Sequence, residues 1–135
     1  MENKAAPPDT IRSGLQESAD LKRIFSIIQS ARADGREILV ETEGLEILEA
    51  MGVATPHRQF VRDADEVSTV DLCAFPGERV VVKVVSPEII HKSEAGGIVF
   101  VPKQPGAISE AIEKMMRTLA PHDVRGFLIG EFVPY

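Results

Sequence analysis

The β-branched run from Val80 to Val85 constrains the fold most, because it favours a strand that is buried on both faces. A single lysine, Lys83, interrupts the run. Burying an ammonium group is costly unless an anion meets it, so Lys83 predicts a carboxylate partner or a phosphate ligand. The alternative is an edge-strand lysine that discourages aggregation between sheets. Ser86-Pro87 ends the strand, because proline offers no amide hydrogen to the ladder.

A polar loop follows this strand. It contains residues 91–94, which read His-Lys-Ser-Glu, and it ends at Gly96-Gly97. Glycines let backbone amides approach a ligand closely, although the same pair would also suit a simple hairpin turn. A second apolar strand is predicted from Ile98 to Val101, so that strand, loop and strand form a hairpin.

The segment from Lys83 to Ile98 carries a specific motif. It reads Lys-Val-Val-Ser-Pro-Glu-Ile-Ile-His-Lys-Ser-Glu-Ala-Gly-Gly-Ile. It closely resembles the signature Lys-Val-x-Ser-Pro-Asp-Ile-x-His-Lys-Ser/Thr-Asp-x-Gly-Gly-Val of the ATP-grasp part of NDP-forming acyl-CoA synthetases, the ADP-forming acetate–CoA ligases. Residues 43–56 are also similar to that family, with a helix that ends at a glycine before a short Val-x-x-Pro segment. The resemblance covers roughly residues 20 to 135, but only a minor part of a complete synthetase.

The resemblance implies roles for the loop residues. Lys83 would contact nucleotide phosphate, and a lysine is suited to this as a point charge on a flexible stem. His91 would relay a phosphoryl group between the nucleotide and a distant catalytic histidine, although a lone histidine is more often a surface residue. Lys92 would neutralise phosphate charge or simply be solvated. Gly96 and Gly97 would belong to a loop that folds over the phosphates.

The last strand, predicted from Gly126 to Val133, resembles the strand that runs into the adenine-binding hinge of the family. Glu131 and Val133 would then bind the nucleotide, with backbone groups pairing with the base. An ordinary core strand is an equal alternative. Two positions depart from the family pattern, because Glu94 replaces an aspartate and Gly130 replaces a residue that is commonly glutamine.

The family implies an activity for the parent enzyme. That activity is the reversible conversion of acid, CoA and ATP to acyl-CoA, ADP and phosphate through a phosphohistidine relay. The second ATP-grasp lobe is expected to be missing, and no acidic or amide cluster follows Val133 for Mg²⁺, so no metal ligand is assigned. Mg²⁺ is expected in the completed enzyme, and CoA in other domains or the α subunit. The isolated chain is expected to be inactive. The alternative function is a non-catalytic nucleotide-binding or interaction module.

Composition limits the partners and the compartment. The 135 residues carry a formal net charge of −6, which gives no basic footprint for nucleic acid. No apolar run approaches the roughly 20 residues of a membrane span, and no secretory signal is evident, so the cytoplasm is predicted. The single cysteine, Cys73, has apolar neighbours and is predicted to be a buried thiol in a reducing compartment.

The order of predicted elements indicates an α+β fold. Residues 1–16 are predicted to form a flexible leader, and residues 17–135 a single domain. Two helices come first, one from the cap Asp20 to Gly35 and one around residues 45–51, with Thr42 as a possible cap. From residue 59 the order is strand, helix, strand, strand, helix, strand, which predicts a mainly antiparallel sheet with helices on one face, as in the smaller ATP-grasp lobe. The predicted helices in this part are residues 63–72 and 108–119. The second helix carries one apolar stripe, formed by Ile108, Ala111, Ile112, Met115 and Leu119.

Overall fold

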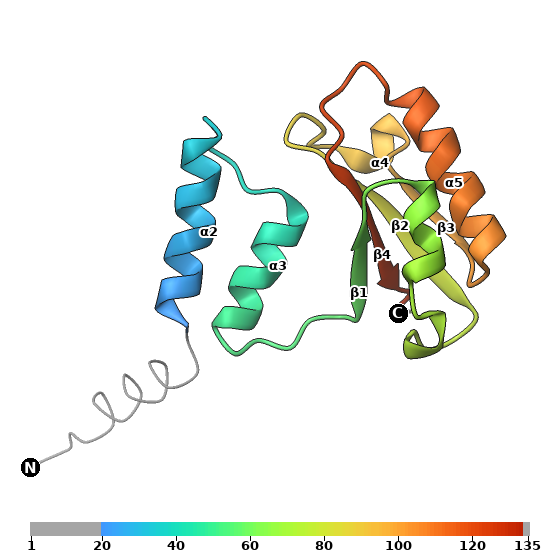
Figure 1. Ribbon diagram of the computed structural model, residues 1–135, viewed down its shortest axis with the longest axis horizontal. Coiled ribbons are helices and arrows are strands. Elements are labelled where there is room, and N and C mark those ends of the chain that lie inside the picture. The colour runs from blue at the N-terminus through green and yellow to red at the C-terminus, as the bar shows by residue number, and fades with distance from the viewer. Residues whose placement is uncertain (1–19, 134–135) are drawn as a thin grey trace, which may run out of the picture. The chain divides into compact units, whose positions relative to one another are not determined.

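The computed structural model describes residues 20–133, shown as the coloured ribbon in Figure 1. Contacts along the chain form two compact units, one ending at Thr55 and one beginning at Pro56. The leader predicted for residues 1–16 lies outside the described residues, and the single domain over 17–135 stays a prediction. No helix in the described part is long and apolar enough to cross a membrane.

The first unit contains the two predicted helices, α2 (Leu21–Ala33) and α3 (Glu41–Ala50). Asp20 caps α2 as predicted, since its carboxylate accepts a hydrogen bond from the Arg23 amide at 3.0 Å. The prediction of Thr42 as the cap of α3 is wrong, because the helix begins one residue before it and Val40 is the cap. The Glu43 carboxylate satisfies the Val40 amide at 2.8 Å, which is the acidic half of a capping box.

An ion-pair cluster around Arg36 joins the end of α2 to the start of α3. The Arg36 guanidinium donates two hydrogen bonds of 2.8 Å to the Glu43 carboxylate and one of 2.8 Å to Asp34. It also donates to the Ile38 carbonyl at 3.1 Å. The hydrogen bonds with Glu43 and then Asp34 raise the pKa of Arg36 above its ordinary value. Bidentate, charge-assisted pairing of this kind fixes geometry as well as charge.

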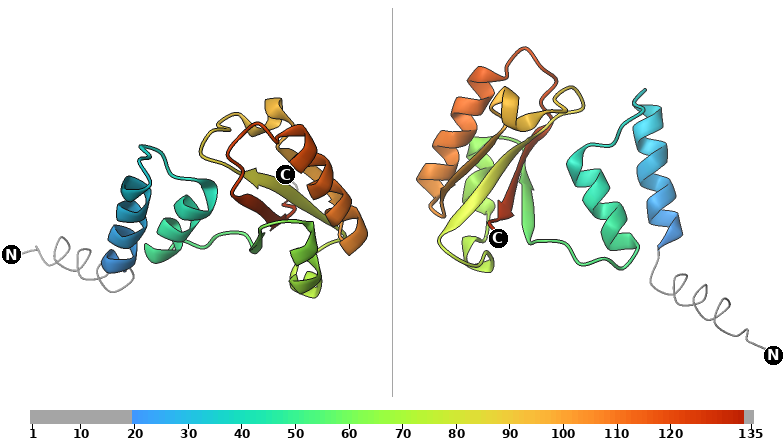
Figure 2. Two further views of the ribbon diagram at one scale, coloured as in Figure 1. Left: turned by 45° about the horizontal axis from the view of Figure 1, so that its top comes forward. Right: turned by 180° about the vertical axis from the view of Figure 1, so that it is seen from behind.

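The second unit is built on an antiparallel sheet of four strands in the order β1-β4-β2-β3. The strands are β1 (Arg58–Val61), β2 (Arg79–Val85), β3 (Ile98–Pro102) and β4 (Gly126–Glu131). Figure 2 shows α5 (Pro105–Thr118) lying along one side of this sheet. The sequence-based prediction of an α+β fold with a mainly antiparallel sheet, preceded by two helices, is therefore confirmed.

One face of the sheet forms the hydrophobic core. Alternate residues of β2 point to it, and Val80, Val82 and Val84 are completely buried. The predicted stripe on α5 packs against them, with Ile108 and Ile112 also completely buried. The rest of the core comes from the neighbouring strands, the short helices and the end of α5, namely Val61, Val67, Phe75, Ile89, Met115, Leu119, Phe127 and Ile129.

The helix predicted over residues 63–72 forms instead two short 3₁₀ helices, η1 (Ala64–Thr69) and η2 (Leu72–Ala74). Polar side chains in this stretch bond to nearby backbone groups, which competes with a continuous α-helix. Asp63 accepts from the Asp65 amide at 2.9 Å, and the Thr69 hydroxyl donates to the Glu66 carbonyl at 2.7 Å. Asp71 then caps the second helix through the Cys73 amide at 3.2 Å.

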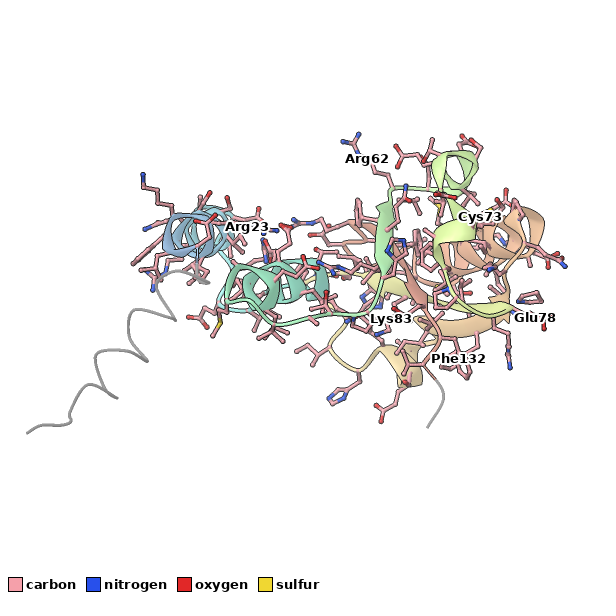
Figure 3. All side chains as sticks on the ribbon, turned by 90° about the horizontal axis from the view of Figure 1, so that it is seen from below. Arg23, Arg62, Cys73, Glu78, Lys83 and Phe132 are labelled. Atoms are coloured by element: carbon pink, nitrogen blue, oxygen red, sulfur yellow. The ribbon has the colours of Figure 1, made fainter. Side chains whose placement is uncertain are left out.

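The prediction of a buried Cys73 thiol is wrong, since Cys73, which Figure 3 labels, is exposed. The buried position in this turn belongs to Phe75, which is 1% exposed. Its ring packs edge-on against His57 at a centroid distance of 4.5 Å. A short 3₁₀ helix turns only some of its side chains towards the core. The apolar neighbours of Cys73 in the sequence therefore did not show which side chain is buried.

Gly126 begins β4 at a place where no side chain fits. A Cβ atom there would clash with the Phe60 ring and lie 2.6 Å from the Val61 carbonyl oxygen. We expect Gly126→Ala to lower the free energy of unfolding by about 1–3 kcal/mol, because β1 must move away from β4. Urea denaturation measures this. Gly106→Ala is the control, since nothing lies within 4 Å of its new methyl group. Equal stability of the two variants would contradict the prediction.

The Arg36 cluster generates a second prediction. Arg36→Ala should destabilise the pairing of α2 with α3 by roughly 1.5–3 kcal/mol, because it removes three charge-assisted hydrogen bonds to the Glu43 and Asp34 carboxylates. Amide hydrogen exchange across α2 and α3 measures the loss of protection. Arg23→Ala is the matched control, because Arg23 is exposed on α2 and its side chain can be shortened without breaking this cluster. Similar exchange in both variants would show that the cluster contributes little.

Candidate functional site

Lys83 lies in the middle of the central strand β2, on the face of the sheet opposite to the core. Its neighbours across the sheet are Leu128 on β4 and Ile98 on β3. Because side chains alternate along a strand, burial of Val82 and Val84 in the core directs Lys83 to the other face, where Figure 3 labels it. The alternative of an edge-strand lysine is wrong, since β2 is paired on both sides.

The loop after β2 is held at its start and exposed at its tip. Ser86 is buried, and its hydroxyl accepts a hydrogen bond from the Glu88 amide at 3.1 Å. Ile89 is 5% exposed and belongs to the core, whereas the next residue, Ile90, is 70% exposed. His91 follows and is also exposed. The loop therefore presents the imidazole to solvent immediately after a buried anchor.

One helical turn, α4 (Lys92–Ala95), follows His91 inside this loop. Gly96 and Gly97 end this turn, and each position requires a glycine for a different reason. Gly96 has a φ of 80°, a left-handed conformation that glycine adopts without strain. At Gly97 a Cβ would lie 2.5 Å from a Val84 methyl carbon, so only glycine allows the turn to rest against β2.

The amides of both glycines bond within the loop. Gly97 donates to the Lys92 carbonyl at 2.6 Å, and Gly96 donates to the Ser93 carbonyl at 3.3 Å. The Gly97 carbonyl accepts from the Val84 amide at 2.8 Å. The glycine pair thus ties Lys92 and α4 to the end of β2, one residue beyond Lys83.

The predicted hinge residues lie at the opposite end of β2. Strand β4 ends at Glu131, so it is two residues shorter than predicted. The Glu131 carboxylate accepts from the His57 amide at 2.6 Å, and the Glu131 amide donates to the His57 carbonyl at 2.9 Å. This residue therefore fastens β4 to the start of β1. Val133, two residues later, is exposed.

A hollow of about 450 Å³ lies beside these hinge residues, lined by residues 76–79 and 131–133. Within it, the Arg79 guanidinium lies 5.7 Å from the centre of the Phe132 ring, which Figure 3 labels near the end of the ribbon. The Phe132 ring also meets Phe100 edge-on at 5.5 Å. Sequence reasoning missed this cluster. Phe132 lay within the predicted hinge, but its contact with Arg79 depends on the pairing of β2 with β4.

The predicted site residues are therefore ordered along one strand. The hinge group is at the Arg79 end of β2, Lys83 is in the middle, and the loop with His91 and Lys92 follows the Val85 end. From Arg79 to Val84 the strand spans roughly 17 Å at the usual rise per residue. This arrangement suits an elongated ligand. No group of three or more His, Cys, Asp or Glu residues within residues 20–133 is placed to hold a metal ion.

Comparison with known proteins identifies relatives of the chain. It is 36% identical over 112 residues to the beta subunit of acetate–CoA ligase [ADP-forming] I from Pyrococcus furiosus, covering 80% of this chain and 47% of the relative. It is 29% identical over 131 residues to 4-hydroxybutyrate–CoA ligase [ADP-forming] from Nitrosopumilus maritimus, covering 93% of this chain and 18% of the relative. The chain thus spans less than half the length of either protein.

A solved structure shares the fold. It is the dinucleotide-forming acetyl-coenzyme A synthetase 1 of Candidatus Korarchaeum cryptofilum in complex with coenzyme A, Ca-AMPCP and HgCl⁺. The TM-score is 0.71 at 24% identity, over 82% of this chain and 49% of that one. The ATP-grasp domain model matches residues 30–134, which is most of the sequence. The chain therefore belongs to the ATP-grasp domain family.

Proposed function

We propose that this chain is the nucleotide-binding lobe of an ADP-forming acyl-CoA ligase, of the beta-subunit type. The observation that carries the proposal is the position of Lys83. It lies on the face of the sheet opposite the core, between a glycine-ended loop and the hollow beside the hinge. An ATP-grasp chain with one cation placed between two such features fits an elongated polyphosphate ligand, with its base at Phe132 and its phosphates towards the loop.

The relatives supply the reaction class. Both curated relatives are ADP-forming CoA ligases, and the solved structure contains coenzyme A and a nucleotide analogue. By extension, the complete protein would convert an acid, CoA and ATP to acyl-CoA, ADP and phosphate. Because this chain spans only part of those proteins, CoA binding and the acid site are assigned to other domains or to a partner α subunit.

His91 is the proposed covalent residue. In the forward step, an imidazole nitrogen would attack the terminal phosphorus of ATP, the bond from that phosphorus to the bridging oxygen would break, and ADP would leave with the electron pair. The phosphoryl group would then pass to a distant histidine of the same enzyme. His91 suits such an exchange, because its side chain is exposed two residues after the buried Ile89 and a second protein segment can therefore reach it.

The described residues are poorly suited to bind Mg²⁺. Phosphoryl transfer normally needs a divalent ion to offset phosphate charge, and Mg²⁺ prefers carboxylate and phosphate oxygens. Residues 20–133 contain no carboxylate-rich group placed for a metal, so no step is assigned to one here. Mg²⁺ ligands are expected from the rest of the completed enzyme.

A non-catalytic nucleotide-binding module is the second candidate. Both glycine amides bond to loop carbonyls, so neither is available to stabilise a transferring phosphoryl group, whereas Lys83 can still bind the nucleotide. Such a module would bind nucleotide without forming a phosphoenzyme. Incubation with radiolabelled ATP separates the two candidates.

The Lys83 role is tested in the complete ligase that contains this lobe. Lys83→Ala should weaken ATP binding roughly 10- to 150-fold, as expected for loss of one hydrogen bond to a charged group, with little change in thermal stability. Calorimetric titration with ATP measures the affinity. Lys114→Ala is the control, since Lys114 is exposed on α5. If Lys83→Ala unfolds the lobe while ATP affinity persists in the folded fraction, Lys83 is structural.

The His91 role is tested by separating chemistry from binding. His91→Ala in the complete ligase should abolish phosphoryl transfer between nucleotide and acyl-CoA, while ATP affinity stays within a few fold because Lys83 and the hinge remain. When the His91→Ala ligase is incubated with radioactive ATP, the labelled protein should lack one phosphorylated component. That component is acid-labile and base-stable, as phosphohistidine is. His57→Gln, which changes another exposed histidine, should retain it. Persistence of both labelling and turnover in His91→Gln would overturn the relay.

A further inference from the structure

Glu88 connects the loop that carries His91 to another part of the second unit. Its carboxylate oxygen Oε1 accepts a hydrogen bond from the backbone amide of Asp123 at 2.9 Å. The same oxygen lies 3.4 Å from Nδ1 of His122. Glu88 is three residues before His91, whereas Asp123 lies in the connection between α5 and β4, 35 residues away.

The segment that receives Glu88 is itself fixed. The Arg125 amide donates to the Val85 carbonyl at 2.8 Å, which joins this connection to the end of β2. The His122 amide donates to the Leu119 carbonyl at 2.9 Å, and Leu119 is buried in the core. The Arg125 side chain also bonds to the Asp123 carboxylate at 2.9 Å. Glu88 therefore binds a segment that is tied to both β2 and the core.

The loop is also held at two points next to Glu88. The Ser86 hydroxyl holds the Glu88 amide, and the buried Ile89 side chain enters the core. Both fix the backbone close to Glu88, and the next side chains along the loop are exposed. After His91, the glycine pair fixes the far side of α4 through Val84. Glu88 adds a hydrogen bond between the His91 side of the loop and the connection from α5 to β4.

We propose that Glu88 is a positioning residue for His91. Its carboxylate oxygen, by accepting from the Asp123 amide, holds the loop so that the imidazole meets the phosphoryl group at one place. This inference rests on the proposed function for its effect on catalysis, but the attachment itself does not. Glu88 is half-exposed, with 53% of its side chain accessible, so replacing it opens no core cavity.

The attachment is tested on the 135-residue chain by nuclear magnetic resonance relaxation of its backbone amides. Glu88→Ala should increase fast motion at residues 89–92 and remove the hydrogen bond from the Asp123 amide, while the sheet amides remain unchanged. Glu88→Gln should resemble the wild-type chain, because a side-chain amide oxygen can still accept from Asp123. Glu113→Ala, an equal change of charge on the exposed face of α5, is the control.

The catalytic consequence is tested in the complete ligase. Glu88→Ala should lower kcat roughly 10- to 100-fold through misplacement of the reacting group, with the KM for ATP nearly unchanged, and Glu88→Gln should restore most of the rate. A residue that only stabilises the fold would instead lower the thermal midpoint and affect both kinetic parameters.

The two tests separate this inference from the proposed function. Unchanged loop motion in Glu88→Ala, or equal loosening in Glu88→Gln, would overturn the attachment. If the loop loosens but kcat is unchanged in a ligase that labels His91, the positioning role is wrong although the proposed function stands. If the wild-type ligase forms no phosphohistidine at His91, the proposed function fails, and with it the catalytic part of this inference, while the attachment to Asp123 is judged by the relaxation data alone.

Discussion

The second unit depends on one central strand that must serve two opposed requirements. β2 is paired on both sides, by β3 and β4, and five of its seven residues are buried. Its even-numbered valines pack under α5, which leaves the alternate positions to the other face. Lys83 occupies one of those positions, so the strand combines a dry core on one side with a cation on the other. A shift of one residue in register would place the ammonium in the core, where burying it would be very costly.

Periodic patterns predicted the regular elements well. The valine run predicted β2, and the apolar stripe of α5 identified four residues that the structure buries, from Ile108 to Leu119. Asp20 and Gly35 marked the ends of α2 because a cap and a left-handed residue are local requirements. These successes share one property, since each depends on residues that are close in sequence.

Features that depend on distant contacts were not predictable in the same way. The polar stretch over residues 63–72 was predicted as one helix, but side-chain bonds to the backbone divide it into 3₁₀ turns. Glu131 was predicted only as a hinge residue, yet its carboxylate binds the backbone of His57, 74 residues earlier. The Arg79 and Phe132 contact likewise requires the pairing of β2 with β4. The motif predicted Lys83, His91 and Lys92 as site residues, and the sheet topology determined how they and the hinge residues are ordered along β2.

The strand order also determines when the sheet can form. β4 is last in the sequence but lies between β1 and β2, so the first strand has no partner until the final strand is in place. Closing such a long loop costs conformational entropy before its contacts repay it. On the ribosome, β2 and β3 can pair as a hairpin, but one side of β2 stays open until residues 126–131 have emerged. Until β4 pairs, this edge of β2 is open to pairing with another chain, so the docking of β4 removes an aggregation-prone edge.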